Sequence, residues 1–404
     1  MSFQQGLSGL SAAAKGLDAV SNNVANANTV GFKGSGAQFS DVYAASVSGT
    51  GAAQIGIGVN VSAVRQNFTQ GNITVTNNPL DVAINGGGFF RVNNNGSIGY
   101  TRNGQFLVDK QGYITNAAGA RLTGYAANAS GVIVPSSPVD LQVSSADLTP
   151  QVTTTAQLGL NLDSRATTPV APFLYTDPAT YNSSTAMTVY DSLGNSHVQS
   201  IYFRKTAANT WAMYTVLDGV AASLTGPTTL GFDSAGALTT AMPLAALTYP
   251  LTNGATTPLS VAMDFTGSTQ FGATFGVNRM VQNGYTSGRL SGLTIAPDGV
   301  VQGRYSNGQT RSLGQIVLVN FASPNGLQSQ GGNMWLETSA SGQPLVGTPN
   351  TGSLGALQSA AVEESNIDLT GELVNMITAQ RNYQANAQSI KTQDAILQTL
   401  VNLR

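Results

Sequence analysis

Both ends of the chain carry apolar residues in a seven-residue repeat, and this feature constrains the fold most. The N-terminal stripe alternates steps of four and three residues through Phe3, Leu7, Leu10, Ala14, Leu17, Ser21 and Val24. The C-terminal stripe is formed by Leu369, Met376, Tyr383, Ile390 and Leu397, with Leu373, Ala387 and Val401 on a companion track. Narrow stripes of this kind are typical of coiled-coil seams. The pattern predicts helices over residues 3–27 and 365–402, forming one α-helical coiled-coil domain.

The start of the second helix is marked by polar residues. Asn366 or Asp368 can cap it, and Glu372 adds negative charge near its first turn. Over so few turns, a period of 3.5 residues is hard to separate from 3.6. The alternative is therefore a pair of ordinary terminal helices packed on one domain.

The sequence between the two helical ends is typical of a β protein. Turn signals that favour hairpins occur at residues 94–96, 103–104, 111–112, 193–195, 298–299 and 307–308. Short alternating or apolar runs predict strands at residues 89–92, 187–190, 198–203 and 315–319. Strands at this spacing favour sandwiches or barrels, so the predicted fold is multidomain and mainly β, with two sandwich-like or barrel-like β domains and a helical domain formed by the two ends of the chain.

Clusters of Pro, Thr, Ser and Gly suggest where the domains divide. The predicted division is a helix at 1–33, a Gly-rich linker or arm at 34–70, a discontinuous β domain at 71–145 and 285–362, an inserted β domain at 146–284, and a helix at 363–404.

Charge is scarce, and this excludes several functions. Only 9% of the 404 residues are charged, with 17 Lys and Arg against 19 Asp and Glu. Nucleic-acid binding needs a basic face, which this composition cannot provide. The chain has no Cys, which excludes disulfides and Cys-based metal sites or nucleophiles. A surface of hydroxyls and amides offers little repulsion between copies of one chain, so the composition suits a protein that packs against neighbours.

No motif indicates an enzyme, a cofactor or a metal site. The one histidine, His197, lies near Asp191 and Ser192, but these residues share one predicted hairpin and are interpreted as a lone surface histidine beside a turn. The Gly-rich run at 86–88 lacks the Lys and Ser/Thr of a phosphate-binding loop and is interpreted as a tight turn or bulge. The sequence therefore predicts no catalytic, cofactor-binding or metal-binding residues.

The chain contains no apolar run of 18 residues, so no membrane insertion is expected. Its first 20 residues lack the basic start and continuous apolar stretch of a secretory signal. The protein is expected either to stay in the cytoplasm or to leave by a route without a cleaved signal.

Two strings at the ends carry a family resemblance. Residues 22–33 read NNVANANTVGFK, and residues 372–386 read ELVNMITAQRNYQAN. Together they resemble the axial rod and hook family of the bacterial flagellum, and within it the hook branch. The motif residues that match are Asn22, Asn23, Asn26, Thr29, Gly31, Phe32, Gln380, Arg381 and Tyr383.

The resemblance implies an extracellular subunit of a self-assembling helical tube, exported through the flagellum's type III apparatus. Such a tube encloses the export channel and bends as a universal joint that transmits torque from rod to filament. The implied partners are other copies of the chain, the distal rod, the hook cap, the hook–filament junction proteins and the export apparatus. Self-assembly is expected to use the apolar stripes of the terminal helices. The alternatives are another axial protein, such as a distal rod or junction protein, or a secreted β-rich adhesin or enzyme.

Overall fold

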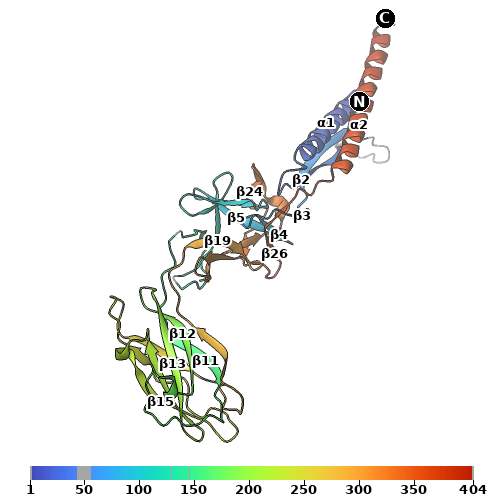
Figure 1. Ribbon diagram of the computed structural model, residues 1–404. Coiled ribbons are helices and arrows are strands. Elements are labelled where there is room, and N and C mark those ends of the chain that lie inside the picture. The colour runs from blue at the N-terminus through green and yellow to red at the C-terminus, as the bar shows by residue number, and fades with distance from the viewer. Residues whose placement is uncertain (1, 43–55, 129, 145, 403–404) are drawn as a thin grey trace. The chain divides into compact units, whose positions relative to one another are not determined.

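The computed structural model describes residues 2–42, 56–128, 130–144 and 146–402. The fold is mainly β, with a helix near each end, α1 (Ser2–Ala25) and α2 (Leu369–Asn402), packed together (Figure 1). This confirms the predicted fold class. The chain divides into two compact units: unit 1 comprises residues 1–144, 292–304 and 310–404, and unit 2 comprises 145–291 and 305–309. The predicted inserted block at 146–284 lies within unit 2.

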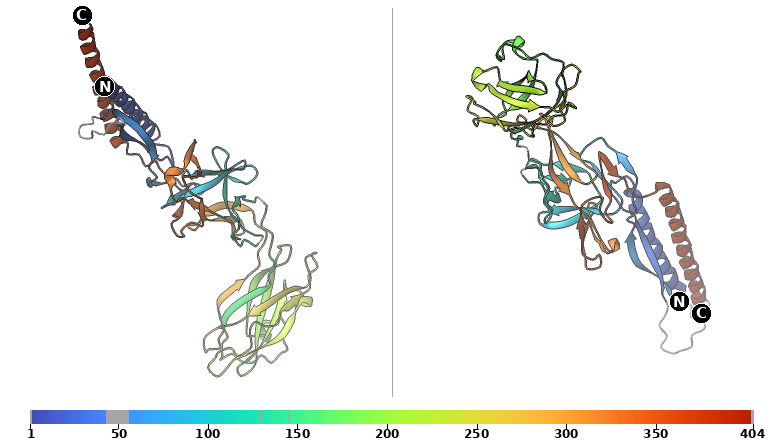
Figure 2. Two further views of the ribbon diagram at one scale, coloured as in Figure 1. Left: turned by 180° about the vertical axis from the view of Figure 1, so that it is seen from behind. Right: turned by 90° about the horizontal axis from the view of Figure 1, so that it is seen from below.

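The two helices run antiparallel and lie side by side in unit 1 (Figure 2). Gly6 of α1 lies beside Ile390 of α2, and Gly9 lies beside Asn386. A Cβ atom on Gly9 would come within 2.7 Å of the Asn386 side chain, so the missing side chain permits the close approach. The helices therefore meet along a track of small residues on α1.

The start of α2 follows the predicted capping chemistry. The Asp368 side chain accepts a hydrogen bond from the Thr370 backbone N–H at 3.0 Å, and Glu372 lies in the first turn. Asp368 is thus the capping residue. The other candidate, Asn366, has a different role that is described below.

The segment predicted as a linker or arm contains two paired strands that the sequence analysis did not anticipate. Strands β1 (Ser35–Val42) and β2 (Gly58–Gln66) form a two-stranded antiparallel sheet, which packs against α1. Residues 43–55 of the predicted arm lie outside the described part of the chain. Pairing gives the backbone N–H and C=O groups of these strands hydrogen-bond partners within the protein, whereas the backbone of a free linker would form hydrogen bonds with water.

The main sheet of unit 1 has 13 strands, in a path that does not follow chain order. The path is β19 (Leu290–Ile295), β20 (Val300–Tyr305), β21 (Thr310–Ile316), β9 (Arg121–Ala126), β5 (Phe89–Asn94), β6 (Ser97–Thr101), β24 (Met334–Leu336) and β23 (Gln328–Gly331). Short strands pair beside it: β7 (Phe106–Val108), β8 (Ile114–Asn116), β10 (Val139–Asp140), β22 (Leu318–Asn320) and β25 (Leu345–Gly347). Phe90, Leu122 and Ile316 are fully buried in its core.

Two further pairs of strands bring the end of the β region back to its beginning. Strand β4 (Val82–Asn85) pairs with β26 (Ala356–Ser359), and β3 (Ile73–Val75) pairs with β27 (Ala361–Glu363). In the second pair, Glu363 lies opposite Ile73. The pairing therefore places Glu363, just before α2, beside the chain that follows β2.

Unit 2 is built from two four-stranded sheets with one shared core. The first has the order β12 (Ser183–Tyr190), β13 (Ser196–Ala207), β14 (Thr210–Leu217) and β15 (Thr225–Gly231); the second has the order β16 (Leu247–Tyr249), β17 (Leu259–Asp264), β11 (Thr155–Asn161) and β18 (Gly276–Gln282). Leu158, Phe203, Trp211, Val261 and Phe265 belong to one buried cluster drawn from both sheets. This arrangement is the sandwich type that strand spacing favoured.

Five of the six predicted hairpin turns connect paired antiparallel strands. The prediction at residues 103–104 is wrong, because the flanking strands β6 and β7 do not pair with each other. Gly104 instead approaches β4, where its carbonyl accepts a hydrogen bond from the Val82 N–H at 2.9 Å. A Cβ atom there would lie 1.7 Å from the Val82 oxygen, so this glycine allows close contact between backbones.

Within the described ranges, neither helix is long and apolar enough to cross a membrane.

Candidate functional site

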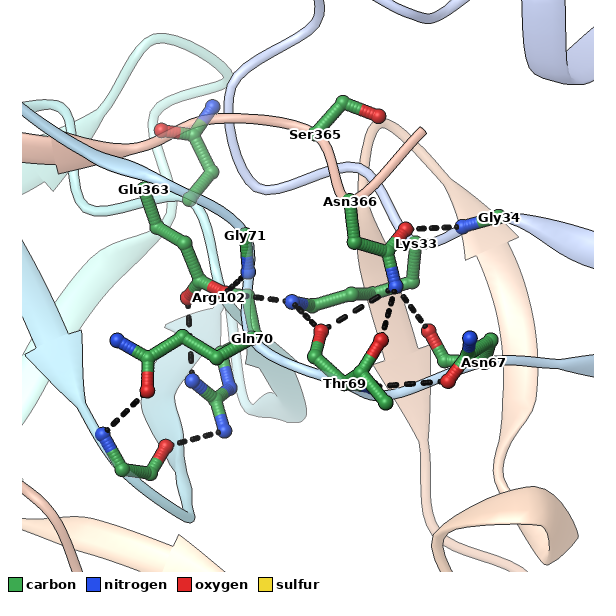
Figure 3. A network of polar contacts seen from close by, with 12 residues as sticks. Lys33, Gly34, Asn67, Thr69, Gln70, Gly71, Arg102, Glu363, Ser365 and Asn366 are labelled. Atoms are coloured by element: carbon green, nitrogen blue, oxygen red, sulfur yellow. Dashed lines mark hydrogen bonds and ion pairs between the residues drawn. The ribbon is translucent and has the colours of Figure 1, made fainter. Parts of the chain in front are cut away.

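The strongest concentration of buried charge lies in unit 1, where both ends of the chain meet the β region. Glu363 at the end of β27 is fully buried, and its carboxylate accepts hydrogen bonds from three donors (Figure 3). Lys33 Nζ lies 2.5 Å from Oε1, the Gly71 backbone nitrogen lies 2.9 Å from Oε1, and Arg102 Nη1 lies 3.1 Å from Oε2. We call Glu363, Lys33, Arg102 and Gly71 the Glu363 network. It joins residues that are 330 positions apart in the sequence.

Both cations of the network have further acceptors. Lys33 Nζ donates to the Thr69 carbonyl at 2.7 Å, and Arg102 Nη2 donates to the Gly86 carbonyl at 2.9 Å. Burial lowers the pKa of Lys33, with the positive charge of Arg102 acting in the same direction and Glu363 opposing it. Burial also lowers the pKa of Arg102, again against Glu363. The negative charge of the Glu363 carboxylate therefore offsets the desolvation cost of burying Lys33 and Arg102.

Asn366 forms a second connection next to the Glu363 network. Its side-chain oxygen accepts the Gly34 N–H at 2.9 Å, and its amide donates to the Asn67 carbonyl at 2.7 Å and to the Thr69 carbonyl at 3.2 Å (Figure 3). One amide side chain thus holds the chain before α2 to both flanks of the β1–β2 sheet. This requirement explains why Asp368 rather than Asn366 caps the helix.

The turn that follows α1 is fastened to the β region as well. The Gly31 N–H donates to the Glu363 carbonyl at 2.8 Å, and the Asn333 side chain donates to the Val30 carbonyl at 2.9 Å. Gly31 has φ of 71°, and a Cβ atom there would lie 2.5 Å from the Asn103 nitrogen. Only glycine satisfies both requirements without displacing the backbone.

Part of the family motif is buried beside this network. Asn23 is buried, accepts the Ser35 N–H at 2.9 Å and donates to the Ser35 carbonyl at 2.8 Å. Asn26 donates to the Asn22 side chain at 2.7 Å and accepts from the Thr29 hydroxyl at 3.2 Å. These contacts shape the turn that leads from α1 to Lys33.

The remaining motif residues lie elsewhere. Phe32 is half-buried, whereas Gln380, Arg381 and Tyr383 are exposed on α2. Their predicted role stays a prediction.

The charges that complete the network have no local signature in the sequence. Lys33 was noted only as the end of a motif, and Glu363 and Arg102 were not singled out as site residues. In a chain with 9% charged residues, the scarcity of charge was the only available signal for Lys33, Arg102 and Glu363. Their convergence depends on the β3–β27 pairing, which no local pattern reveals.

The apolar stripes predicted for self-assembly do not lie mainly between α1 and α2. Phe3 and Leu7 are 44% and 52% exposed on α1, and Leu369, Leu373 and Leu397 are 45%, 44% and 55% exposed on α2. The partly buried members of the predicted set are Leu10, Leu17, Val24, Met376 and Ile390. The side chain of Val401 lies outside the described part of the chain. Much of the stripe is thus left uncovered within one chain.

A second polar cluster lies in unit 2 and corrects the interpretation of His197. This residue is 9% exposed and therefore is not a surface histidine. Its Nδ1 lies 2.6 Å from an Asp218 oxygen and its Nε2 lies 3.2 Å from an Asp191 oxygen. Asp191 also accepts from the side chains of Asn195 at 2.9 Å and Asn253 at 2.6 Å. Desolvation opposes charge on both groups, but the hydrogen bonds outweigh it, lowering the pKa of Asp191 and raising that of His197.

Neither cluster has the features of a reactive centre. The residues that the structure describes contain no group of three or more His, Asp or Glu side chains placed to hold a metal ion. In the Glu363 network the donors and acceptors satisfy one another, so the arrangement supplies mechanical connection between segments.

Family models match four separate parts of the chain. They are described as flagella basal body rod protein (residues 3–33), flagellar hook protein FlgE/F/G D1 domain (83–147), flagellar basal body protein FlaE D2 domain (161–285) and flagellar basal body rod FlgEFG protein C-terminal (358–403). Together these matches extend over most of the sequence, including both helices.

Curated relatives match over the full length. The chain is 44% identical to the flagellar hook protein FlgE of Escherichia coli K12 and 46% identical to that of Salmonella typhimurium, with both chains covered completely in each comparison. Among solved structures, the flagellar hook protein FlgE2 of Helicobacter pylori matches 70% of this chain and 99% of its own, with a TM-score of 0.52 and 14% identity. That last likeness concerns the fold alone.

The Glu363 network predicts a large effect of neutralising its carboxylate. Glu363→Gln should destabilise unit 1 by about 3–5 kcal/mol, because it leaves two buried cations without their counter-charge. Urea unfolding can be followed by Trp335 fluorescence in a Trp211→Phe background. The matched control is Glu364→Gln, an exposed neighbour, which should change stability by about 0.5 kcal/mol or less. Equal stability of the two variants would contradict the prediction.

The single histidine allows a direct titration by NMR. The midpoint for His197 should lie above the ordinary value of 6.5, and Asp218→Asn should lower it. Since the folded-state pKa is raised, the stabilisation of unit 2 is complete below the unfolded-state pKa and is lost as pH rises through the folded-state pKa. A midpoint at or below 6.5 would show that burial outweighs the two carboxylates.

Proposed function

The chain belongs to the family of flagellar hook proteins and is a structural subunit of the extracellular hook, and from this premise we propose how it assembles. Identity of 44–46% over the full length favours the hook over the rod, junction, adhesin and enzyme alternatives. We propose that copies of the chain form a helical tube, with the apolar stripes of α1 and α2 as the main contacts between copies.

The observation that carries this proposal is the exposure of large apolar side chains on the helix pair. Phe3, Leu7, Leu373 and Ile377 are between 44% and 52% exposed although they lie on regular helices. Full burial of an exposed side chain of this size is worth about 1.5–3 kcal/mol, so covering the exposed half of each one would stabilise association by roughly 1 kcal/mol. A head-to-tail contact between different surfaces of successive copies produces a helical polymer when its rotation does not close a ring.

The polar composition supports a tube that bends. Contacts between copies made by hydroxyls and amides can exchange partners with each other or with water at little cost. Charged pairs would favour one register and resist sliding. We propose that bending takes place at contacts between copies while the Glu363 network keeps each chain's helices attached to the β region of unit 1. The tube would then act as a universal joint that transmits torque.

Specific partners and the domain division are part of the same proposal. We propose contacts with the distal rod, the hook cap and the hook–filament junction proteins, and passage through the type III export apparatus into a channel enclosed by the tube. Residues 1–33 and 363–404 would form the inner tube, and 71–145 with 285–362, and 146–284, would form the β domains. The support for these statements is the family membership together with the uncovered helix surface.

Leu7→Asp tests the proposed contact surface. The variant should raise the concentration needed for polymerisation by about tenfold or more, because a charge replaces a side chain that becomes buried between copies. Sedimentation and electron microscopy measure the polymer, and circular dichroism verifies the monomer. The control is Gln4→Asp, which adds the same charge to an exposed position one turn away. Unchanged polymerisation of Leu7→Asp would contradict the proposal.

A further inference from the structure

An apolar groove runs along the helix pair in unit 1. It has a volume of about 550 Å³ and is lined mostly by small residues of both helices, with Phe39 from β1, Val59 from β2 and two polar side chains from α2, Asn382 and Asn386. Gly9, Ala13 and Gly16 contribute from α1, Ala379 and Ala385 from α2, and Phe39 from β1. No charged side chain lines it. The missing side chains leave room for a bulky apolar group from elsewhere.

The far end of α2 carries side chains of the complementary kind. Helix α1 begins at Ser2, four residues before Gly6, whereas α2 continues to Asn402, twelve residues after Ile390, which lies beside Gly6. The last turns of α2 therefore extend past α1 by about 12 Å at 1.5 Å per residue (Figure 1). In this overhang Ile396 is 56% exposed and Leu397 is 55% exposed.

Leu397 continues the face of α2 that packs on α1. It lies seven residues, or two turns, after Ile390, whose side chain contacts the glycine track at Gly6. Within one chain, this face of α2 packs against small residues of α1 only where the two helices lie side by side. Leu397 lies past the first residue of α1 and has no such partner among the residues that the structure describes. The groove presents the same kind of small-residue surface to any neighbour.

The chain cannot fill its own groove with this side chain. Leu397 is eleven residues after Asn386, the groove residue nearest to it along α2, which corresponds to about 16 Å along a rigid helix. The occupant must therefore come from another molecule. A second copy supplies an apolar, uncovered helix end, and the family forms a polymer in which such copies are adjacent.

We propose that the overhanging end of α2 in one copy inserts Leu397, with Ile396 beside it, into the groove of the next copy along the tube. The inference rests on the proposed self-assembly and specifies one of its contacts. Because groove and overhang are different surfaces of the same chain, the contact is head to tail and can repeat from copy to copy along a tube. Each copy would provide one end and receive another.

Cysteine pairing tests this contact directly, since the chain has no native Cys. One set of chains carries Leu397→Cys and another carries Ala13→Cys, and both are added as minor components to unmodified chains under polymerising conditions. A disulfide requires Cα atoms within about 7 Å, so oxidation should produce covalent dimers with one chain of each kind. The matched control replaces Ala13→Cys by Lys15→Cys, two residues along α1 and exposed. We expect the mixed dimer to exceed the control by about tenfold or more because of that distance limit.

The outcomes separate this inference from the proposed function. Tubes that contain both labelled chains but yield mixed dimers no more often than the control would overturn the docking of Leu397 while leaving self-assembly intact. Failure of unmodified chains to form tubes would overturn self-assembly and the docking with it. Mixed dimers that depend on both Ala13→Cys and Leu397→Cys, and that are absent from unpolymerised protein, would support the docking.

Discussion

The buried carboxylate of Glu363 is the interaction on which the arrangement of unit 1 depends. It receives Lys33 from the turn after α1, Arg102 from the β region and the Gly71 N–H from the chain after β2. Removing charges from water is costly, and the cost is offset only when partners and geometry are held in place. The network therefore links correct placement of both chain ends to correct folding of the strands between them. The proposed transmission of torque would require such a link between the helices and the β region.

The helix pair leaves apolar surface uncovered, and we propose that assembly uses this surface. Because α1 meets α2 through Gly6 and Gly9, the bulky residues Phe3 and Leu7 are not used within the chain. A leucine seam between the two helices would have consumed this apolar surface. The low charge of the protein serves the same purpose, since surfaces of hydroxyls and amides can approach copies of themselves without strong repulsion. The structure thus combines a firm internal connection with an uncovered helix surface, which we propose forms contacts between copies that can readjust.

Local patterns predicted the elements better than the contacts between them. Seven-residue repeats identified both helices, and Gly-containing turns identified five hairpins, because these signals depend on neighbouring residues. The same repeats could not show that α1 would pack through its glycines, since a stripe shows periodicity but not the partner. Glu363 and Arg102 meet only through strand pairing across the chain. His197 lies six residues from Asp191, but its contact with Asp218 depends on the pairing of β13 with β14. Sites built from distant residues were therefore missed.

Hydrogen exchange at the Gly71 amide is the most direct test of the central claim that the Glu363 network fastens the chain ends to the β region. This N–H is bonded to the Glu363 carboxylate, whereas the buried Leu141 N–H is bonded to Leu122 within the main sheet region. If the network opens only when unit 1 unfolds, both amides exchange at the slow rate of global unfolding. Exchange of Gly71 orders of magnitude faster than Leu141 would contradict the account, because the junction would then open while the sheet stays folded.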